Sequence, residues 1–293
     1  MSQLCSATVS PMRTRSMLFG PATRVDFVAK FVASGTDIGV LDLEDAVAEA
    51  DKGHARSAIT DAQPGAGDLE SMHLFVRVNA LDTGHFADDI AAAASAAAHG
   101  IIVPKLEAAN EVRDARAAME ASGLGSAALC AGVESAAGVH AAVEVASAEV
   151  DMVYFGAEDF ITDIGGVRTD SNSEVLYARS QVALAARLGG VPALDQVVTD
   201  FSDGDRFERE AREARAMGYS GKLCIHPGQV GLALAAFTPS EQQVAWAHGV
   251  LAAVEESGGA GVTSFEGTKV DAPIILRAKA LISQSEPEES DIE

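Results

Sequence analysis

The chain has 293 residues, of which 48% are apolar, and 43 acidic residues against 21 basic ones give it a net charge of −22. So acidic a chain repels the phosphate backbone, and we therefore expect no nucleic acid partner. It has no apolar run of about 18 residues and no apolar stretch near its amino end, so we expect no membrane span, no secretion and a cytoplasmic location.

Eight short apolar runs alternate along the chain with stretches of helical spacing that are rich in Ala, Glu and Arg. The runs lie at residues 16–21, 38–45, 73–79, 100–107, 129–135, 152–159, 191–198 and 222–227. Strand–helix units in this succession are typical of an α/β fold, the closed parallel (β/α)8 TIM barrel with its helices outside. A chain of 293 residues suits one such barrel with an extension.

The pattern changes after residue 236, where the segment FTPSEQ begins. It predicts a helix over 239–256, a Gly-rich break at 257–261 and a second helix over 274–284. We therefore expect a catalytic barrel at residues 1–236, a helical, lid-like extension at 237–284 and a disordered acidic tail at 285–293.

Charged residues lie at the ends of several predicted strands. They are Glu44, Asp45, Arg77, Lys105, Glu134, Glu158, Asp159 and His226. Barrel enzymes carry their chemistry at the carboxyl ends of the strands, so the sequence predicts an active site built from these side chains.

Glu134 and Asp159 end the predicted fifth and sixth strands, which are neighbours in such a barrel. Two carboxylates brought this close repel each other unless a proton or a cation lies between them. Oxygen ligands without a nearby His or Cys pair suit Mg²⁺, for which Mn²⁺ can substitute, and Glu44 and Asp45 could orient its waters. The alternative is that these acids cap the following helices, where Asp and Glu are favoured in any case.

Three basic side chains at strand ends allow more than one interpretation. Arg77 interrupts an apolar strand, so it either binds a substrate carboxylate or forms an internal ion pair with Glu44 or Glu134. Lys105 could form a Schiff base, although the surrounding acids are expected to keep it protonated. His226 could act as a general base, line the ligand entrance or serve a structural role.

Taken together, these motifs resemble those of a known family. The chain resembles the citrate lyase β-subunit-like family in RSMLFGP, LDLEDAV, FVRVN, IIVPKLE, FGAEDF and GKLCIHPGQV, which follow in this order between about residues 15 and 230. That family belongs to the Mg²⁺-dependent carbon–carbon lyases that act on acyl thioesters. The segment GTKVDAP (267–273) is similar to one near the end of the family's longer members, the malyl-CoA and citramalyl-CoA lyases.

The resemblance implies a role for each residue at the barrel mouth. Glu134 and Asp159 match the family's metal ligands, and Glu134 also adjoins the substrate. Arg77 matches the arginine that holds the substrate carboxylate. Glu44 and Asp45 match acids beside the metal, and together with Arg77 they are the catalytic residues that the resemblance implies in the barrel.

The resemblance also implies a homo-oligomer, a trimer or a hexamer. Asp271 matches a catalytic aspartate that, in the longer members, reaches into a neighbouring subunit and protonates the thioester enolate. The phosphates of CoA need a basic patch on so acidic a chain, and Arg15, Arg24 and Lys30 near the mouth of the first strand are its candidates. His226 is a further candidate for substrate binding.

The expected reaction is the Mg²⁺-dependent cleavage of malyl-CoA, methylmalyl-CoA or citramalyl-CoA to an acyl-CoA and a small 2-oxo acid, glyoxylate or pyruvate. Three alternatives stay open: a thioesterase, the citryl-thioester lyase subunit of a citrate lyase complex, and a non-catalytic CoA-binding barrel. The C-terminal segment argues against the complex. The intact set of Arg77, Glu134, Asp159 and Asp271 argues against a non-catalytic barrel.

Overall fold

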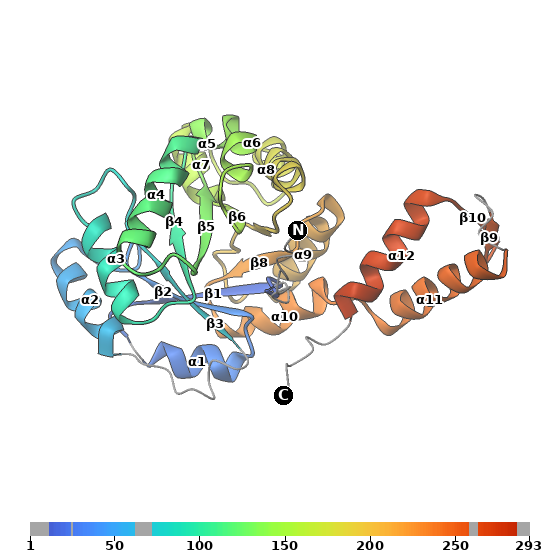
Figure 1. Ribbon diagram of the computed structural model, residues 1–293, viewed down its shortest axis with the longest axis horizontal. Helices are drawn as coiled ribbons and strands as arrows, with labels where there is room; N and C mark the ends of the chain where they lie inside the picture. The colour runs from blue at the N-terminus through green and yellow to red at the C-terminus, as the bar shows by residue number, and fades with distance from the viewer. Residues whose placement is uncertain (1–11, 25, 62–71, 258–262, 286–293) are drawn as a thin grey trace, which may run out of the picture. The chain divides into compact units, whose positions relative to one another are not determined.

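Eight parallel strands close into a barrel in the computed structural model, which describes residues 12–24, 26–61, 72–257 and 263–285. The strands are β1 (Ser16–Pro21), β2 (Ile38–Asp42), β3 (His73–Arg77), β4 (Gly100–Val103), β5 (Ala128–Val133), β6 (Met152–Phe155), β7 (Ala193–Asp195) and β8 (Gly221–Cys224). Each strand pairs with the next, and β1 also pairs with β8, which completes the ring (Figure 1). The predicted TIM barrel is confirmed.

Helices surround this ring of strands (Figure 1). They are α1 (Phe27–Ser34), α2 (Lys52–Asp61) with the 3₁₀ turn η1 (Glu49–Asp51) before it, α3 (Phe86–Ser95), α4 (Ala109–Ala121), α5 (Ala136–His140), α6 (Ala142–Ala146), α7 (Ala157–Asp163), α8 (Leu176–Gly189), α9 (Gly204–Met217) and α10 (Pro227–Phe237). Every residue of β2 and β4 is buried, because side chains pack inside the barrel and against the helices. This burial on both faces explains why the strands read as continuous apolar runs.

Two strands end earlier than their apolar runs suggest. β2 ends at Asp42 rather than at Asp45, and β6 ends at Phe155. Glu158 and Asp159 lie in the first turn of α7, where the helix dipole and unpaired backbone N–H groups favour carboxylates. Asp159 therefore stands at the start of a helix rather than at a strand end, although it still lies on the carboxyl side of β6.

A second compact unit begins at Thr238. It contains α11 (Glu241–Glu256), β9 (Thr263–Phe265), β10 (Thr268–Val270) and α12 (Ala272–Ser285). The two short strands pair antiparallel, and the sequence analysis did not predict them. Glu266 and Gly267 join them with φ angles of 48° and 75°, as in a hairpin turn whose two central residues are both left-handed.

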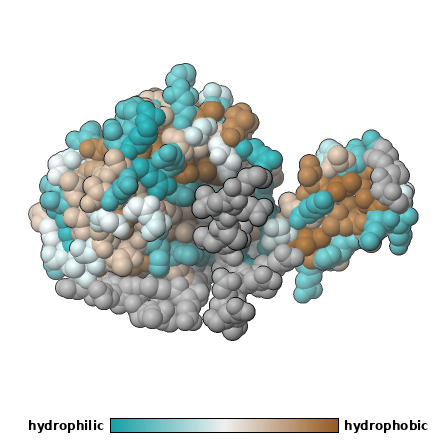
Figure 2. All heavy atoms as spheres, in the orientation of Figure 1, coloured by the Kyte–Doolittle hydropathy of each residue, from teal (hydrophilic) through white to brown (hydrophobic). Residues whose placement is uncertain are grey.

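The two helices of this unit pack around a small apolar core of Ala247, Val250, Val270, Ala278 and Leu281. Apolar side chains also gather on its surface over α11 and α12 (Figure 2). The predicted second helix lies within α12, whereas residues 286–293 of the predicted acidic tail lie outside the described residues. Across the part of the chain that the structure describes, no helix is long and apolar enough to cross a membrane.

Candidate active site

A cavity of about 420 Å³ lies at the carboxyl ends of the barrel strands. Its polar lining includes Asp42, Asp45, Arg77, Glu134, Tyr154, Glu158 and Asp159. Its apolar lining includes Phe19, Pro21, Val197, Leu223 and Ile225. The barrel thus brings together side chains that lie far apart in the sequence.

Arg77 is held by two carboxylates from the neighbouring strand and its loop. Its Nε and Nη2 donate to Oδ1 and Oδ2 of Asp42 at 2.7 and 2.6 Å, and its Nη1 lies 3.0 Å from Oε2 of Glu44. Burial disfavours the charge on the guanidinium, but the carboxylates outweigh burial, so the pKa of Arg77 lies well above its usual value. The internal ion pair with Glu44 is therefore present, and Asp42 is the stronger partner.

Asp42 was missed by the sequence analysis, which assigned the functional role to Glu44 and Asp45, two and three residues later. The register provides the signal, because β2 and β3 have equal length and Asp42 pairs with Arg77 at their common end. A charged residue inside one buried strand, opposite a charged residue in the next, indicates an ion pair.

Glu134 is only 2% exposed, and both of its carboxylate oxygens accept hydrogen bonds. The backbone N–H of Lys105 donates to Oε1 at 3.0 Å, and the hydroxyl of Tyr154 donates to Oε2 at 2.9 Å. Gly156 provides the necessary room, since a Cβ there would lie 2.3 Å from Oε2. Burial, together with the charge of Glu44, raises the pKa of Glu134 to about 8.

Lys105 bridges two of the acids. Its Nζ lies 2.9 Å from Oε1 of Glu44 and 3.5 Å from Oδ1 of Asp159, and its φ of 55° is unusual for a residue other than glycine. Burial would lower the pKa of Lys105, but the bond to Glu44 and the surrounding carboxylates outweigh burial and raise this pKa well above its usual value. A protonated amine is a poor nucleophile, which argues against a Schiff base at Lys105.

These groups carry more negative than positive charge. The carboxylates Asp42, Glu44, Asp45 and Asp159 meet the two cations Arg77 and Lys105, and the fifth acid, Glu134, adds a further charge when it loses its proton. A hard divalent cation would offset this repulsion, and carboxylate oxygens are the ligands it prefers. Glu134 and Asp159 line the cavity and have the ligand chemistry to hold such an ion.

Lys52 and Asn79 support the loop that carries Glu44, and the sequence analysis gave neither a role. The Lys52 ammonium is buried and donates to the backbone oxygens of Leu43 and Glu44 at 2.9 and 3.1 Å and to Asn79 Oδ1 at 2.7 Å. Asn79 in turn donates to Leu43 and to the buried Asp89. These bonds fix the backbone that aims Glu44 at Arg77.

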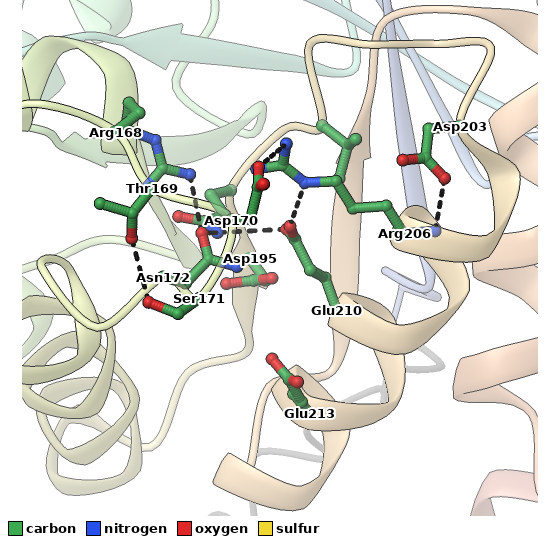
Figure 3. Close-up of polar contacts among 12 residues, drawn as sticks. Arg168, Thr169, Asp170, Ser171, Asn172, Asp195, Asp203, Arg206, Glu210 and Glu213 are labelled. Carbon is green, nitrogen blue, oxygen red and sulfur yellow. Dashed lines mark hydrogen bonds and ion pairs between the residues drawn. The ribbon is translucent and has the colours of Figure 1, made fainter.

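Arg168 ties the start of α7 to the loop that follows it, and the sequence analysis missed it as well. Its Nε lies 2.9 Å from Glu158, its Nη1 2.6 Å from Glu174 and its Nη2 3.0 Å from Asn172. Figure 3 shows Arg168 within this loop, with Asn172 turned toward Glu210 of α9. Glu158 adjoins Asp159, so this network anchors the helical turn that carries the candidate metal ligand.

A buried group of charges supports β7 and β8 beneath that loop. Asp195 accepts two bonds from Arg179 at 2.9 Å each and one from Lys222 at 2.7 Å. Burial would raise the pKa of Glu210, but Lys222 and the bond from Arg206 outweigh burial and lower it to about 2. Charges paired in this way have a scaffolding role on the helix side of the strands.

Arg15 does not lie at the barrel mouth, which corrects its predicted place in a CoA patch. It precedes β1, and its Nη2 pairs with Asp37, which precedes β2, at 2.6 Å. Both residues therefore stand at the amino end of the barrel, and the six residues of β1 separate them from the mouth by about 20 Å. The prediction failed because Arg15 comes before its strand rather than after it.

Arg24 and Lys30 do lie on the mouth side, in the loop after β1 and in the first half of α1. Both contact the ring of Phe27, at 5.4 and 4.2 Å from its centroid, and both pair with Asp26. Their predicted role in binding CoA phosphates stays a prediction.

His226 follows β8 and is exposed. Its ring stacks on Phe201 with centroids 5.0 Å apart, and its Nδ1 lies 3.1 Å from the backbone N–H of Gly228. The cavity lining from this segment comes from Leu223 and Ile225 instead. This position suits the predicted role of His226 in lining the ligand entrance better than a role as general base inside the cavity.

Asp271 belongs to the second unit. It comes directly before α12, is 35% exposed and lies 3.2 Å from Nζ of Lys269. Its part in the chemistry of the barrel stays a prediction.

Residues 15–227 match the family described as HpcH/HpaI aldolase/citrate lyase. The chain belongs to this family. It is 48% identical over 283 residues to the citrate lyase subunit beta-like protein of Deinococcus radiodurans, which covers 93% of this chain and 98% of that protein. It is 31% identical over 288 residues to mouse mitochondrial citramalyl-CoA lyase, a match that covers 92% of this chain and 85% of that protein.

A solved structure of a relative supports the same family and the same fold. CitE from Mycobacterium tuberculosis, in complex with magnesium, acetoacetate and coenzyme A, matches with a TM-score of 0.78 at 36% identity, over 92% of this chain and 97% of that chain. These comparisons confirm the predicted family, fold and enzyme class, that of a lyase.

Proposed function

We propose that the protein is a magnesium-dependent lyase that cleaves a 3-hydroxyacyl-CoA, such as citramalyl-CoA or malyl-CoA, to an acyl-CoA and a 2-oxo acid. The observation that carries this proposal is the meeting of Glu134, Asp159 and Arg77 in one cavity at the barrel mouth. The mouse relative named citramalyl-CoA lyase and the CitE complex with magnesium, acetoacetate and coenzyme A support it.

Glu134 and Asp159 would hold the metal ion. When bound, Mg²⁺ supplies Lewis acidity toward a carbonyl oxygen. Lys105 contacts both proposed ligands, since its backbone N–H donates to Glu134 and its ammonium lies 3.5 Å from Asp159. Glu44 pairs with the same ammonium, and Asp45 lies 3.7 Å from Arg77. Mn²⁺ would serve in place of Mg²⁺, because it takes the same oxygen ligands.

Arg77 would bind the carboxylate of the substrate's oxo-acid half. Asp42 accepts hydrogen bonds from two of the five N–H groups of Arg77, on Nε and Nη2, while Glu44 lies 3.0 Å from Nη1 as an ion pair. N–H groups on Nη1 and Nη2 are thus left to donate to a substrate carboxylate. Because Asp42 fixes the plane of the guanidinium before substrate arrives, little side-chain entropy is lost on binding.

Cleavage leaves charge on the thioester half of the substrate, which the site must stabilise and then protonate. Asp271 is the proposed proton donor, acting on the cavity of a neighbouring subunit in a homo-oligomer. Arg24 and Lys30 are the proposed contacts for the phosphates of CoA, since a chain of charge −22 needs local basic residues to bind such a ligand.

The experiment that tests this proposal is a product assay on a panel of CoA thioesters with Mg²⁺. Release of glyoxylate or pyruvate together with an acyl-CoA is expected of a lyase. Release of free CoA and an intact dicarboxylate would instead establish a thioesterase. Activity on a citryl thioester only in the presence of further subunits would establish a citrate lyase component.

A further inference from the structure

Tyr154 forms part of the wall of the active-site cavity, yet the proposed reaction gives it no role. Its side chain is only 1% exposed, it extends from β6, and its hydroxyl donates to Oε2 of Glu134 at 2.9 Å. The strand next to it leaves space for the phenol. Gly132 of β5 stands opposite Tyr154, and a Cβ at Gly132 would lie 2.5 Å from the Tyr154 hydroxyl oxygen.

The Glu134 carboxylate is therefore held by one hydrogen bond to each of its oxygens. Tyr154 donates to one oxygen, the backbone N–H of Lys105 donates to the other at 3.0 Å, and Gly156 admits the carboxylate without a clash. A carboxylate oxygen has two lone-pair directions, so a single bond to each oxygen fixes the group and leaves one direction free on each.

We propose that Tyr154 is a positioning residue that orients the Glu134 carboxylate for the metal ion. This inference rests on the proposed function, because it assigns Tyr154 a part in building the metal site. Groups that hydrogen-bond to a metal ligand fix its orientation, and losing one costs about 10- to 100-fold in metal affinity. Phenylalanine fills the same space as tyrosine and lacks only the donor.

The chain offers a matched control in Tyr219. It is also buried, at 3% exposed, and its hydroxyl donates to the backbone oxygen of Arg179 at 2.9 Å. Removing that hydroxyl disturbs a buried hydrogen bond of the same length without touching the cavity.

The test measures Mn²⁺ binding to the full-length protein by electron paramagnetic resonance, with the metal alone and no substrate. The dissociation constant of the Tyr154→Phe variant is expected to rise about tenfold or more over that of the parent. That of Tyr219→Phe is expected to stay unchanged. Should Tyr154→Phe fail to fold, Tyr154→Met also lacks the donor and carries the same expectation.

Three results would overturn the inference. If the parent binds Mn²⁺ and Tyr154→Phe binds it equally well, Tyr154 has no positioning role and the proposed function stands. If Tyr219→Phe weakens binding as much as Tyr154→Phe, the effect is one of general packing. If the parent itself binds no Mn²⁺, the metal site of the proposed function fails, and this inference fails with it.

Discussion

Arg77 and Asp42 face each other at the common end of β2 and β3 and are joined by two parallel hydrogen bonds of 2.7 and 2.6 Å. Both side chains are almost wholly buried, with 13% and 3% of their surface exposed. This pairing sets the orientation of the guanidinium plane, so Arg77 is fixed by the fold itself.

The Arg77→Lys variant tests whether that orientation matters for the reaction. A lysine retains the charge but cannot replace a planar fork that binds Asp42 and a substrate carboxylate together. We expect kcat/KM to fall by the equivalent of about 2–3 kcal/mol in transition-state binding. Arg212→Lys, on the exposed face of α9, should leave kcat/KM unchanged. A fall of less than about tenfold in Arg77→Lys would make Arg77 a structural ion-pair member only.

The sequence was sufficient to predict the barrel, because few other folds accommodate eight apolar runs separated by helical segments. It also placed Arg77, Glu134 and Asp159 at one end, since parallel strands share their carboxyl edge. It could not predict the partner of Arg77, because Asp42 reads as an ordinary member of the LDLED segment until the register of β2 against β3 is known.

Other misses have a similar cause. Tyr154 reads as one apolar residue among MVYF, and only the cavity shows that its hydroxyl reaches Glu134. Lys52 reads as a surface residue at the start of a helix, although its ammonium is buried against the loop that carries Glu44. Arg15 is a different case, because the sequence already places it before the strand that starts at Ser16, and a residue before a strand lies at the amino end of the barrel.

The raised pKa of Glu134 makes the stability of the metal-free protein depend on pH. Between about pH 4.5, the ordinary value, and about pH 8, the folded protein keeps this proton while the unfolded chain has lost it. Folding therefore binds a proton in this window, and stability falls as pH rises, by at most about 1.4 kcal/mol per pH unit. Denaturant unfolding with a chelator present, between these two pH values, measures the slope.

The variant Glu134→Gln cannot ionise at this position and should lack that part of the slope. The exposed Glu255→Gln serves as the control and should follow the parent. Parent and Glu134→Gln curves that run parallel over the whole window would show that Glu134 ionises normally in the folded protein.

Lys52→Met is expected to weaken both stability and turnover. It removes three hydrogen bonds, two to the backbone of Leu43 and Glu44 and one to Asn79. The buried Asn79 Oδ1 loses its donor, whereas the Leu43 and Glu44 oxygens keep only their bonds from Asn79 and from the Val47 N–H. We expect the free energy of unfolding to fall by about 2 kcal/mol or more, measured by urea titration. Lys279→Met, exposed on α12, should change it by less than about 0.5 kcal/mol. An unchanged midpoint in Lys52→Met would mean that the loop holds Glu44 without it.

Asp271→Asn is expected to leave Mn²⁺ and substrate binding nearly intact while lowering kcat, because only proton transfer is lost. If the site is shared between subunits, mixing Asp271→Asn protomers with Arg77→Ala protomers should restore part of the activity that each lacks alone. Confirmed mixed oligomers without any rescue would place the action of Asp271 within its own chain or exclude it from the reaction.

The most direct test of the central claim is the initial rate of 2-oxo acid release from citramalyl-CoA or malyl-CoA as a function of free Mg²⁺, after exhaustive chelation. For the parent we expect no release without metal and a rate that saturates as Mg²⁺ is added back, and for Glu134→Gln no release at any of these concentrations. Equal rates with and without metal, or full activity in Glu134→Gln, would contradict the assignment of Glu134 and Asp159 as the metal ligands of a lyase.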